Sequence, residues 1–437
     1  MGYISGAQAA FSQRSRAAAN CGRFPPIHQT HGAESSGRQP CRLDLTTQPS
    51  AWLCRLCITV GRTILVGVAC LTLATHHPRS QAAEVSVVQV VPLTGAVAKD
   101  AEGVVLGVRV GVDATNGRGG IKGTAVKLRV TDDRYQPQET ERLLREGVAG
   151  GAVAAIMPVG SASVLHLLKS GALDDMQLPI VGVVPGAQVL RRPGSPWLFH
   201  LRASDDQQIE KIVEHAWTVG QRRIAILYGD IPFGHAGLAA ATSALTARSA
   251  KAVLEAPFEM ANPEAALGGI GQKLRTAGAD SVLVVAGATQ SGKLVKLLRS
   301  EGVFAPIYAL SYADVATVCD IAGLQAARGI GIAQIVPNHS SGALRIAAEF
   351  QRDWGRYAPQ SATPSQYAFE GYIAWRVLAD AVSRGNEPLT RLGVRRALEQ
   401  LSEFGVPGFR VGFSPQIREG AQFVDIGVVS DNCRLKY

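Results

Sequence analysis

From Glu84 onward, short runs of apolar residues alternate with segments in which apolar residues recur every three to four positions. This alternation is typical of βαβ units and favours an α/β fold with parallel sheets. The short runs are almost continuously apolar, as expected of strands buried on both faces. They predict strands at 85–91, 125–131, 152–157, 179–184, 223–228, 281–286, 306–310 and 329–336. The fold class predicted here is therefore α/β with doubly wound parallel sheets.

The segments between these strands carry helical patterns. In 206–219, Ile209, Ile212, Val213 and Ala216 fall on one helical face, and Ser204 or Asp205 can cap the first turn. Comparable apolar stripes predict helices at 139–148, 264–277, 291–300 and 366–384. Strands and helices thus alternate through most of the chain.

A chain of 437 residues is too long for a single compact core and suits two domains of ordinary size. One βα series ends near the motif FHLRASDDQQ (199–208), and a second begins at Arg223. The tail differs, because three helices (341–357, 365–385 and near 389–402) precede GFRVGF and FVDIGVV, which we expect to pair as strands. We expect lobe 1 to comprise 84–204 with 337–405, and lobe 2 to comprise 205–336 with 406–437, joined by a hinge of several crossings.

The region before Glu84 indicates export. The run TILVGVACLTLAT (63–75) is apolar, follows Arg55 and Arg62, and leads into small residues, as in a secretory signal. We therefore assign 51–83 to a signal-like segment, with an uncleaved membrane anchor as the alternative. Residues 1–50 form either a disordered leader or the product of a start codon placed too far upstream. Whether 51–83 is a cleaved signal or an uncleaved anchor, we expect the bulk of the chain to lie outside the cytoplasm.

Charge and cysteine content both change at this boundary. The formal net charge is +9, but residues 1–83 hold eight Arg and only Glu34 and Asp44, so +6 lies there and +3 remains for the rest. Without a basic stripe in the folded part, we expect no nucleic-acid partner. Five of the seven cysteines precede residue 84. The other two, Cys319 and Cys433, can form one disulfide or stay as buried thiols.

No motif in the sequence supplies catalytic chemistry. The string GATQSGKL (287–294) fits a phosphate loop except that Leu294 stands where a magnesium-binding hydroxyl is needed, so we interpret it as a helix start or a ligand-facing turn. Asp132 and Asp133 are adjacent at a strand end, so they point in opposite directions and are expected to serve as turn residues. We predict no enzyme activity, no catalytic residues, no metal site and no cofactor.

Loops rich in Gly, Ser and Thr follow several of the predicted strands. They span 92–103, 158–163, 184–188, 229–237 and 286–290. In open α/β sheets, ligands bind beyond the carboxyl ends of strands, where backbone N–H groups and helix N-termini converge. Because these five loops divide between the two halves, we expect them to form one ligand-binding cleft.

The order and spacing of several blocks resemble a known family. These blocks are PLTGAVAKDAEG (92–103), VTDD, IMPVGSAS, LPIVGVV, FHLRASDDQQ, RRIAILYGDIPFGHAG, GADSVLVVAGATQSGKLVKLLRSEG and QYAFEGYIAWRVLADAV. Together they resemble type I periplasmic binding proteins, within them the leucine/isoleucine/valine-binding branch of ABC transporter receptors. The resemblance covers about residues 84–430 and implies three crossings of the chain between the lobes.

The resemblance also implies ligand-binding positions. From the first lobe these are Ser161, Ser163, Val184, Pro185 and Gly186, with Asp100 near the place of a family tyrosine. From the second lobe they are Phe233, Ala288, Thr289, Ser311 and Tyr312.

This chain departs from the family where the ligand's ammonium group would be received, because the motif SYAD (311–314) offers no Glu there. An ammonium without a carboxylate partner would be poorly compensated for its desolvation. We therefore expect a small polar metabolite, either an amino acid or a related carboxylate or amide.

The resemblance further implies a monomeric receptor in the periplasm that delivers its ligand to an ABC permease in the inner membrane. The alternative is a periplasmic sensor or accessory binding protein of the same fold without a transport role.

Overall fold

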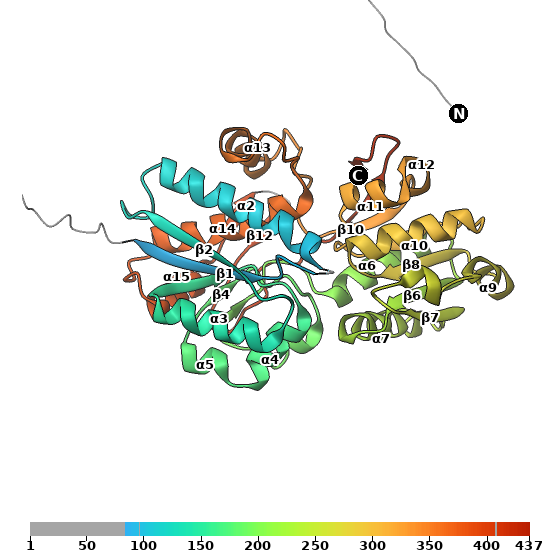
Figure 1. The fold of residues 1–437 in the computed structure, drawn as a ribbon, viewed down its shortest axis with the longest axis horizontal. Coiled ribbons are helices and arrows are strands. Elements are labelled where there is room, and N and C mark those ends of the chain that lie inside the picture. The colour runs from blue at the N-terminus through green and yellow to red at the C-terminus, as the bar shows by residue number, and fades with distance from the viewer. Residues whose placement is uncertain (1–83, 96, 407–408) are drawn as a thin grey trace, which may run out of the picture. The chain divides into compact units, whose positions relative to one another are not determined.

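The computed structural model describes residues 84–95, 97–406 and 409–437, which form part of one compact unit built on two main sheets (Figure 1). The predicted leader (1–50) and signal-like segment (51–83) lie outside the described residues. Within the described ranges, we find no helix with the length and apolar character needed to cross a membrane.

The first sheet is entirely parallel, with strand order β2-β1-β3-β4-β5. Its strands are β1 (Val85–Val91), β2 (Val126–Asp132), β3 (Ala152–Ile156), β4 (Ile180–Val181) and β5 (Leu198–Phe199). β1 is buried along almost its whole length, as its continuous apolar run predicts.

Helices cover both faces of the first sheet (Figure 1). Val88 and Val90 of β1 pack with α3 (Pro137–Ala149), α4 (Ser161–Lys169) and α5 (Ala172–Met176). Val87 and Val91 point to the opposite face, where α2 (Ala98–Gly117) packs along α14 (Gln366–Arg384). The remaining helices of this half are η1 (Gln188–Leu190), α13 (Arg345–Tyr357) and α15 (Arg391–Glu399).

The second sheet has the order β14-β13-β10-β9-β8-β6-β7. Its parallel strands are β6 (Ile224–Gly229), β7 (Leu254–Phe258), β8 (Ser281–Val285), β9 (Ile307–Ala309) and β10 (Gly331–Gln334). The antiparallel strands β13 (Asp425–Val429) and β14 (Leu435–Lys436) extend it beyond β10.

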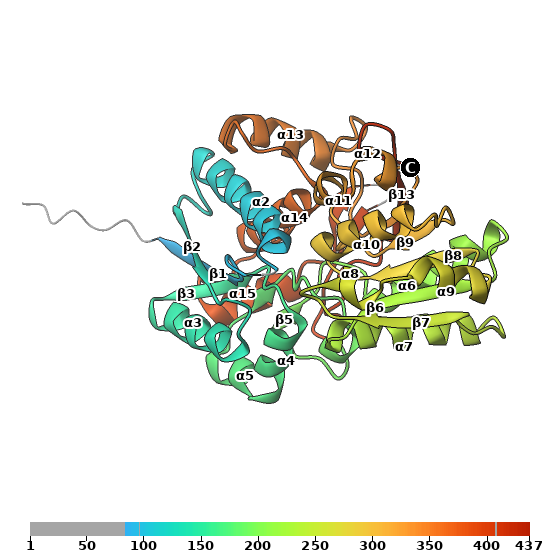
Figure 2. The ribbon, with the colours of Figure 1, turned by 45° about the vertical axis from the view of Figure 1, so that its right-hand side comes forward.

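One face of the second sheet packs against α6 (Asp205–Thr218) and α7 (Pro232–Thr246). The other face packs mainly against α9 (Ile270–Ala277), α10 (Ala288–Ser300) and α11 (Val315–Ala322), with the short helices α8 (Pro263–Ala266) and α12 (Leu324–Ala327) beside them (Figure 2). Both sheets therefore carry helices on their two faces, so the predicted fold class is confirmed.

The chain passes between the two sheets in three segments, at residues 200–204, 335–344 and 412–424. The third segment first runs beside β5. The backbone N–H of His200 donates to the Arg418 carbonyl, and the backbone N–H of Gly420 donates to the His200 carbonyl, at 2.8 Å each. The division expected near residue 405 stays a prediction.

Two sequence-based expectations about local structure were wrong. GFRVGF and FVDIGVV do not pair with each other: β12 (Phe409–Val411) pairs with β11 (Phe404–Val406), whereas β13 pairs with β10 and β14. The predicted helix 264–277 is broken into α8 and α9. Gly269 has a φ of +73° at the break, which glycine adopts without the strain of a side chain.

The two late cysteines form a disulfide. Cys319 on α11 is bonded to Cys433, which lies between β13 and β14. The sequence left this pairing open because the distance between residues so far apart in the chain depends on the tertiary fold. The bond attaches the C-terminal segment to α11.

Candidate functional site

The two sheets have the same winding order around their first strands. β1 lies between β2 and β3, and β6 lies between β7 and β8, so each sheet reverses its winding direction at that point. The predicted loops 92–103, 158–163, 229–237 and 286–290 follow β1, β3, β6 and β8. They therefore begin at the carboxyl ends of the strands that flank both switch points, where ligands bind in such sheets.

The loop after β1 is tied to the end of β2 through Asp132. Its carboxylate accepts hydrogen bonds from the Leu93 backbone N–H (2.8 Å), the Thr94 hydroxyl (2.6 Å) and the Arg134 backbone N–H (2.9 Å). Burial works against these bonds, but together they lower the pKa of Asp132. Asp132 is thus a turn residue, as the sequence indicates.

Ser161 and Ser163 occupy the first turn of α4 with different environments. Ser161 is half-buried and begins the helix after Gly160, whose φ is +112°. Ser163 is buried, and its Oγ lies 2.9 Å from Oγ1 of Thr140, which donates to Asp133 at 2.6 Å. Ser163 is thereby held in a network within the first half, and Ser161 is the more accessible of the two hydroxyls.

The loop after β4 contacts the second half of the protein directly. The backbone N–H of Gly186 donates to the Tyr312 hydroxyl at 2.8 Å, and that hydroxyl donates to Oδ1 of Asp205 at 2.7 Å. Tyr312 follows β9 and Asp205 begins α6. Two of the predicted ligand contacts, Gly186 and Tyr312, therefore lie together, and each satisfies the other's hydrogen-bonding group.

Electrostatics keep the Tyr312 hydroxyl protonated. Burial, reinforced by the nearby Asp205 carboxylate, raises the pKa of Tyr312 far above its ordinary value. Burial likewise raises the pKa of Asp205. Since Tyr312 keeps its proton, it can donate to Asp205 while it accepts from Gly186.

A buried ion pair lies beside this tyrosine. Arg202 makes a bidentate contact with Glu370 of α14 (2.9 and 2.8 Å) and donates to the Val184 carbonyl at 2.7 Å. Burial alone would lower the pKa of Arg202, but the charge and hydrogen bonds of Glu370, together with the nearby tyrosines, outweigh burial, and the pKa lies above its usual value. The guanidinium carbon also stands 4.7 Å from the centre of the Tyr312 ring. Arg202 thus connects the first crossing, α14 and Tyr312.

Phe233 and the start of α10 also contribute to the site from the second half of the protein. The Phe233 ring meets Tyr312 edge-on, with ring centres 5.0 Å apart. Ala288 is buried and Thr289 half-buried in the first turn of α10, which contacts α2. The string GATQSGKL forms the start of α10, and the Lys293 ammonium lies 3.8 Å from the Glu264 carboxylate.

The other predicted positions are less closely connected. The Ser311 backbone N–H donates to the Gln208 side chain at 3.0 Å, and the Ser311 hydroxyl is buried without a hydrogen-bond partner among the described residues. Pro185 is buried between Val184 and Gly186. Asp100 lies in the first turn of α2, and only its backbone is described. The structure thus brings Val184, Gly186, Phe233 and Tyr312 together.

Sequence reasoning missed the charged residues that support this region. Arg202, Asp205 and Glu370 are each at most 4% exposed. A signal was present, because Arg202 and Asp205 lie in the motif that marks the break between halves, and buried charges need partners. Their partners are far away in the chain, so the pattern alone could not pair them.

In the part of the chain that the structure describes, no group of His, Cys, Asp and Glu side chains is arranged to hold a metal ion. The geometry offers backbone donors, hydroxyls and aromatic surface on two facing sets of loops. Comparison with known proteins decides the family, because the model of a family described as periplasmic binding protein matches residues 84–431.

The chain belongs to the periplasmic binding protein family. Members of this family are binding proteins, so the fold serves to hold a ligand. Two solved structures similar to this periplasmic binding protein are each 30% identical to it. An extracellular ligand-binding receptor from Verminephrobacter eiseniae has a TM-score of 0.77 and covers 81% of this chain and 100% of its own. A substrate-binding periplasmic protein from Ralstonia solanacearum has a TM-score of 0.74 and covers 80% and 98%.

A curated relative lies in the leucine/isoleucine/valine-binding branch. It is a Leu/Ile/Val-binding protein homolog from Brucella melitensis, 24% identical to this periplasmic binding protein over 222 residues. The match covers 50% of this chain and 59% of the relative, so it spans less than two thirds of that relative's length. The resemblance derived from the sequence blocks is confirmed at the level of the family.

Proposed function

We propose that this protein is the periplasmic substrate-binding component of an ABC transporter. It binds a small polar metabolite, an amino acid or a related carboxylate or amide, between the loops of its two sheets. The observation that carries the proposal is the hydrogen bond between Gly186 and Tyr312, because it joins a ligand-type loop of one sheet to that of the other. The ABC permease of the inner membrane receives the ligand from the monomeric receptor.

The ligand lies, in this proposal, beside that hydrogen bond. Ser161 offers a hydroxyl from the first half, and Phe233 and Thr289 offer an aromatic edge and a helix start from the second. The half-buried state of all three leaves them able to contact a ligand. Ser163, Val184, Pro185, Gly186, Ala288, Ser311 and Tyr312 shape the surrounding walls, and Asp100 lies at the margin.

A ligand screen tests the binding function. Purified protein is heated with amino acids, aromatic acids, amides and short polyols, and a ligand that binds the folded state raises the melting temperature. We expect one compound class to do so, with an affinity of about −8 to −10 kcal/mol. If no compound in a broad set raised the melting temperature, the proposal would lose its support.

Two tryptophan substitutions test the location. Ser161→Trp places a bulky ring at the start of α4 and should abolish the ligand-induced rise in melting temperature. Lys169→Trp adds the same ring at the exposed far end of the same helix and should leave the rise intact. Equal ligand binding in both variants would contradict the proposed position of the ligand.

A further inference from the structure

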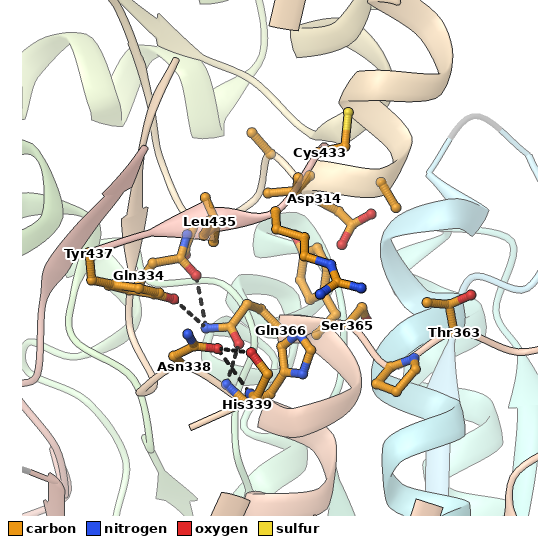
Figure 3. Close-up of a pocket in the computed structure, with 18 of the residues that line it drawn as sticks. Asp314, Gln334, Asn338, His339, Thr363, Ser365, Gln366, Cys433, Leu435 and Tyr437 are labelled. Atoms are coloured by element: carbon orange, nitrogen blue, oxygen red, sulfur yellow. Dashed lines mark hydrogen bonds between the residues drawn. The ribbon is translucent and has the colours of Figure 1, made fainter. Parts of the chain in front are cut away.

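A separate cavity of about 470 Å³ takes none of its lining residues from the five predicted ligand loops. Figure 3 shows the residues that line it. Its walls come from the segment after β9, the segment after β10, the start of α14 and the C-terminal residues 432–437. Ser311 is its one wall residue among the predicted site residues. The volume falls within the range typical of small-molecule sites.

The floor of the cavity is held in place by hydrogen bonds. The Gln366 amide donates to Gln334 at 2.9 Å and to the Tyr437 hydroxyl at 3.3 Å, and its oxygen accepts the His339 backbone N–H at 3.0 Å (Figure 3). Because Gln366 and Gln334 are hydrogen-bonded to each other, their amides hold the walls in place. We therefore do not count these two amides among the groups that would bind a ligand. Cys433, bonded to Cys319, fixes the segment that carries the next residue, Arg434.

Three of the remaining wall residues, Asn338, His339 and Arg434, can donate hydrogen bonds to a ligand. The Gln351 amide nitrogen lies 3.2 Å from Nδ1 of His339, so that ring nitrogen accepts and the neutral imidazole carries its proton on Nε2. Burial, with the positive charge of Arg434 as the second cause, lowers the pKa of His339 to about 4, so the ring is neutral near pH 7. Within the described residues, the Asn338 amide nitrogen and the Arg434 guanidinium donate no hydrogen bond.

The charged residues that line the cavity limit the kind of ligand that it can bind. Arg434 supplies one positive charge, and guanidinium groups bind carboxylates strongly through paired hydrogen bonds. Asp314 also lines the cavity, where its carboxylate caps α11 by accepting from Thr317 at 3.0 Å. Because Asp314 opposes every negative charge in the cavity, the single arginine can offset one carboxylate at most.

We propose that this cavity is a second ligand site that binds a small monocarboxylate, with Arg434 as its counter-charge and Asn338 and His339 as neutral donors. The site goes beyond the proposed transport function because its walls are distinct from the loops around Ser161 and Phe233. Its walls come from α14 on one side and from α11 and the C-terminal segment on the other, so an occupant touches elements packed on both sheets.

Nuclear magnetic resonance of the histidine rings tests this site. The protein is titrated with 4-methylpentanoate and, separately, with its neutral counterpart 4-methylpentanamide, and the His339 ring signal is assigned by its loss in His339→Gln. The carboxylate should shift this signal in a saturable way, and the amide should bind about tenfold or more weakly. Absence of a shift at millimolar carboxylate, or equal binding of the amide, would overturn the proposal.

Charge-matched variants locate the bound carboxylate. Arg434→Gln should weaken the binding measured at His339 by about tenfold or more, whereas Arg328→Gln removes an exposed arginine outside the cavity lining and should leave it unchanged. Equal weakening in both variants, or in neither, would overturn the site. In Ser161→Trp the shift at His339 should persist, which separates failure of this site from failure of the transport proposal.

Discussion

The hydroxyl of Tyr312 lies 2.8 Å from the backbone nitrogen of Gly186, so a side chain carried by the second sheet accepts the free N–H of a loop on the first. The same hydroxyl donates to the buried carboxylate of Asp205. Loss of the hydroxyl leaves the Gly186 N–H and the Asp205 carboxylate without this partner. A buried polar group without a hydrogen-bond partner destabilises the folded state.

Tyr312→Phe should destabilise the protein by about 1–3 kcal/mol, because the Gly186 N–H and the Asp205 carboxylate lose their hydrogen bond. Tyr228→Phe is the matched control, since both tyrosines are 8% exposed and no hydrogen bond of the Tyr228 hydroxyl is described. Urea unfolding of both variants measures the difference. Equal midpoints would show that the Tyr312 hydroxyl contributes nothing specific.

Gly186 itself tolerates no side chain. A Cβ at Gly186 would collide with Oδ1 of Asp205 and would lie 2.9 Å from the backbone nitrogen of Asp205. Gly186→Ala should therefore cost about 1–3 kcal/mol of folding stability. Gly342→Ala, whose Cβ meets no atom within 4 Å, is the control and should unfold like the parent protein.

The buried pair Arg202–Glu370 should show strong coupling. Glu370→Leu alone leaves the Arg202 charge unpaired and should cost about 3–5 kcal/mol, as should Arg202→Met. The double variant should lose less than the sum of the two, because neither charge then remains buried alone. A double-mutant cycle measured by denaturant unfolding tests this, and additive losses would contradict the pairing.

Acid should destabilise the protein through His200. Burial, with Arg191 as the next cause, lowers the pKa of His200 to about 3, whereas the ordinary value is 6.5. Between these two values the unfolded state binds a proton that the folded state does not, so this contribution is complete above pH 6.5 and is lost as the pH falls toward 3.

The variant His200→Gln isolates this effect. It should show a shallower fall in unfolding free energy between pH 6.5 and 4 than the parent protein, since the titrating ring is gone. Parallel curves for the variant and the parent protein would show that His200 does not titrate as the structure predicts.

The sequence predicted the parts of the fold that depend on local pattern. β1 was predicted at its observed bounds, and Ser204 caps α6 in a capping box with Gln207. β7 was missed because Glu255 and Pro257 interrupt its apolar pattern, which an edge strand tolerates. The pairing of β13 with β10 was mispredicted because strand partners far apart in the chain are chosen by tertiary packing.

The sequence also predicted part of the candidate site. Gly186, Phe233 and Tyr312 were chosen from a resemblance, and the structure brings them together. Their support by Arg202 and Glu370 was not predictable, because 168 residues separate the two charges. A local pattern shows that a charge lies among apolar neighbours, but only the fold shows which opposite charge stabilises it.

Native mass spectrometry of the protein purified from cells tests the central claim most directly. The measurement is made in the Arg434→Gln background, in which the second cavity is weakened. We predict that Arg434→Gln carries one small carboxylate or amide per chain, that Arg434→Gln with Lys169→Trp carries it too, and that Arg434→Gln with Ser161→Trp has lost it. Retention of the same molecule by the Ser161→Trp double variant, or no bound molecule in Arg434→Gln even after incubation with the compounds of the ligand screen, would contradict the account.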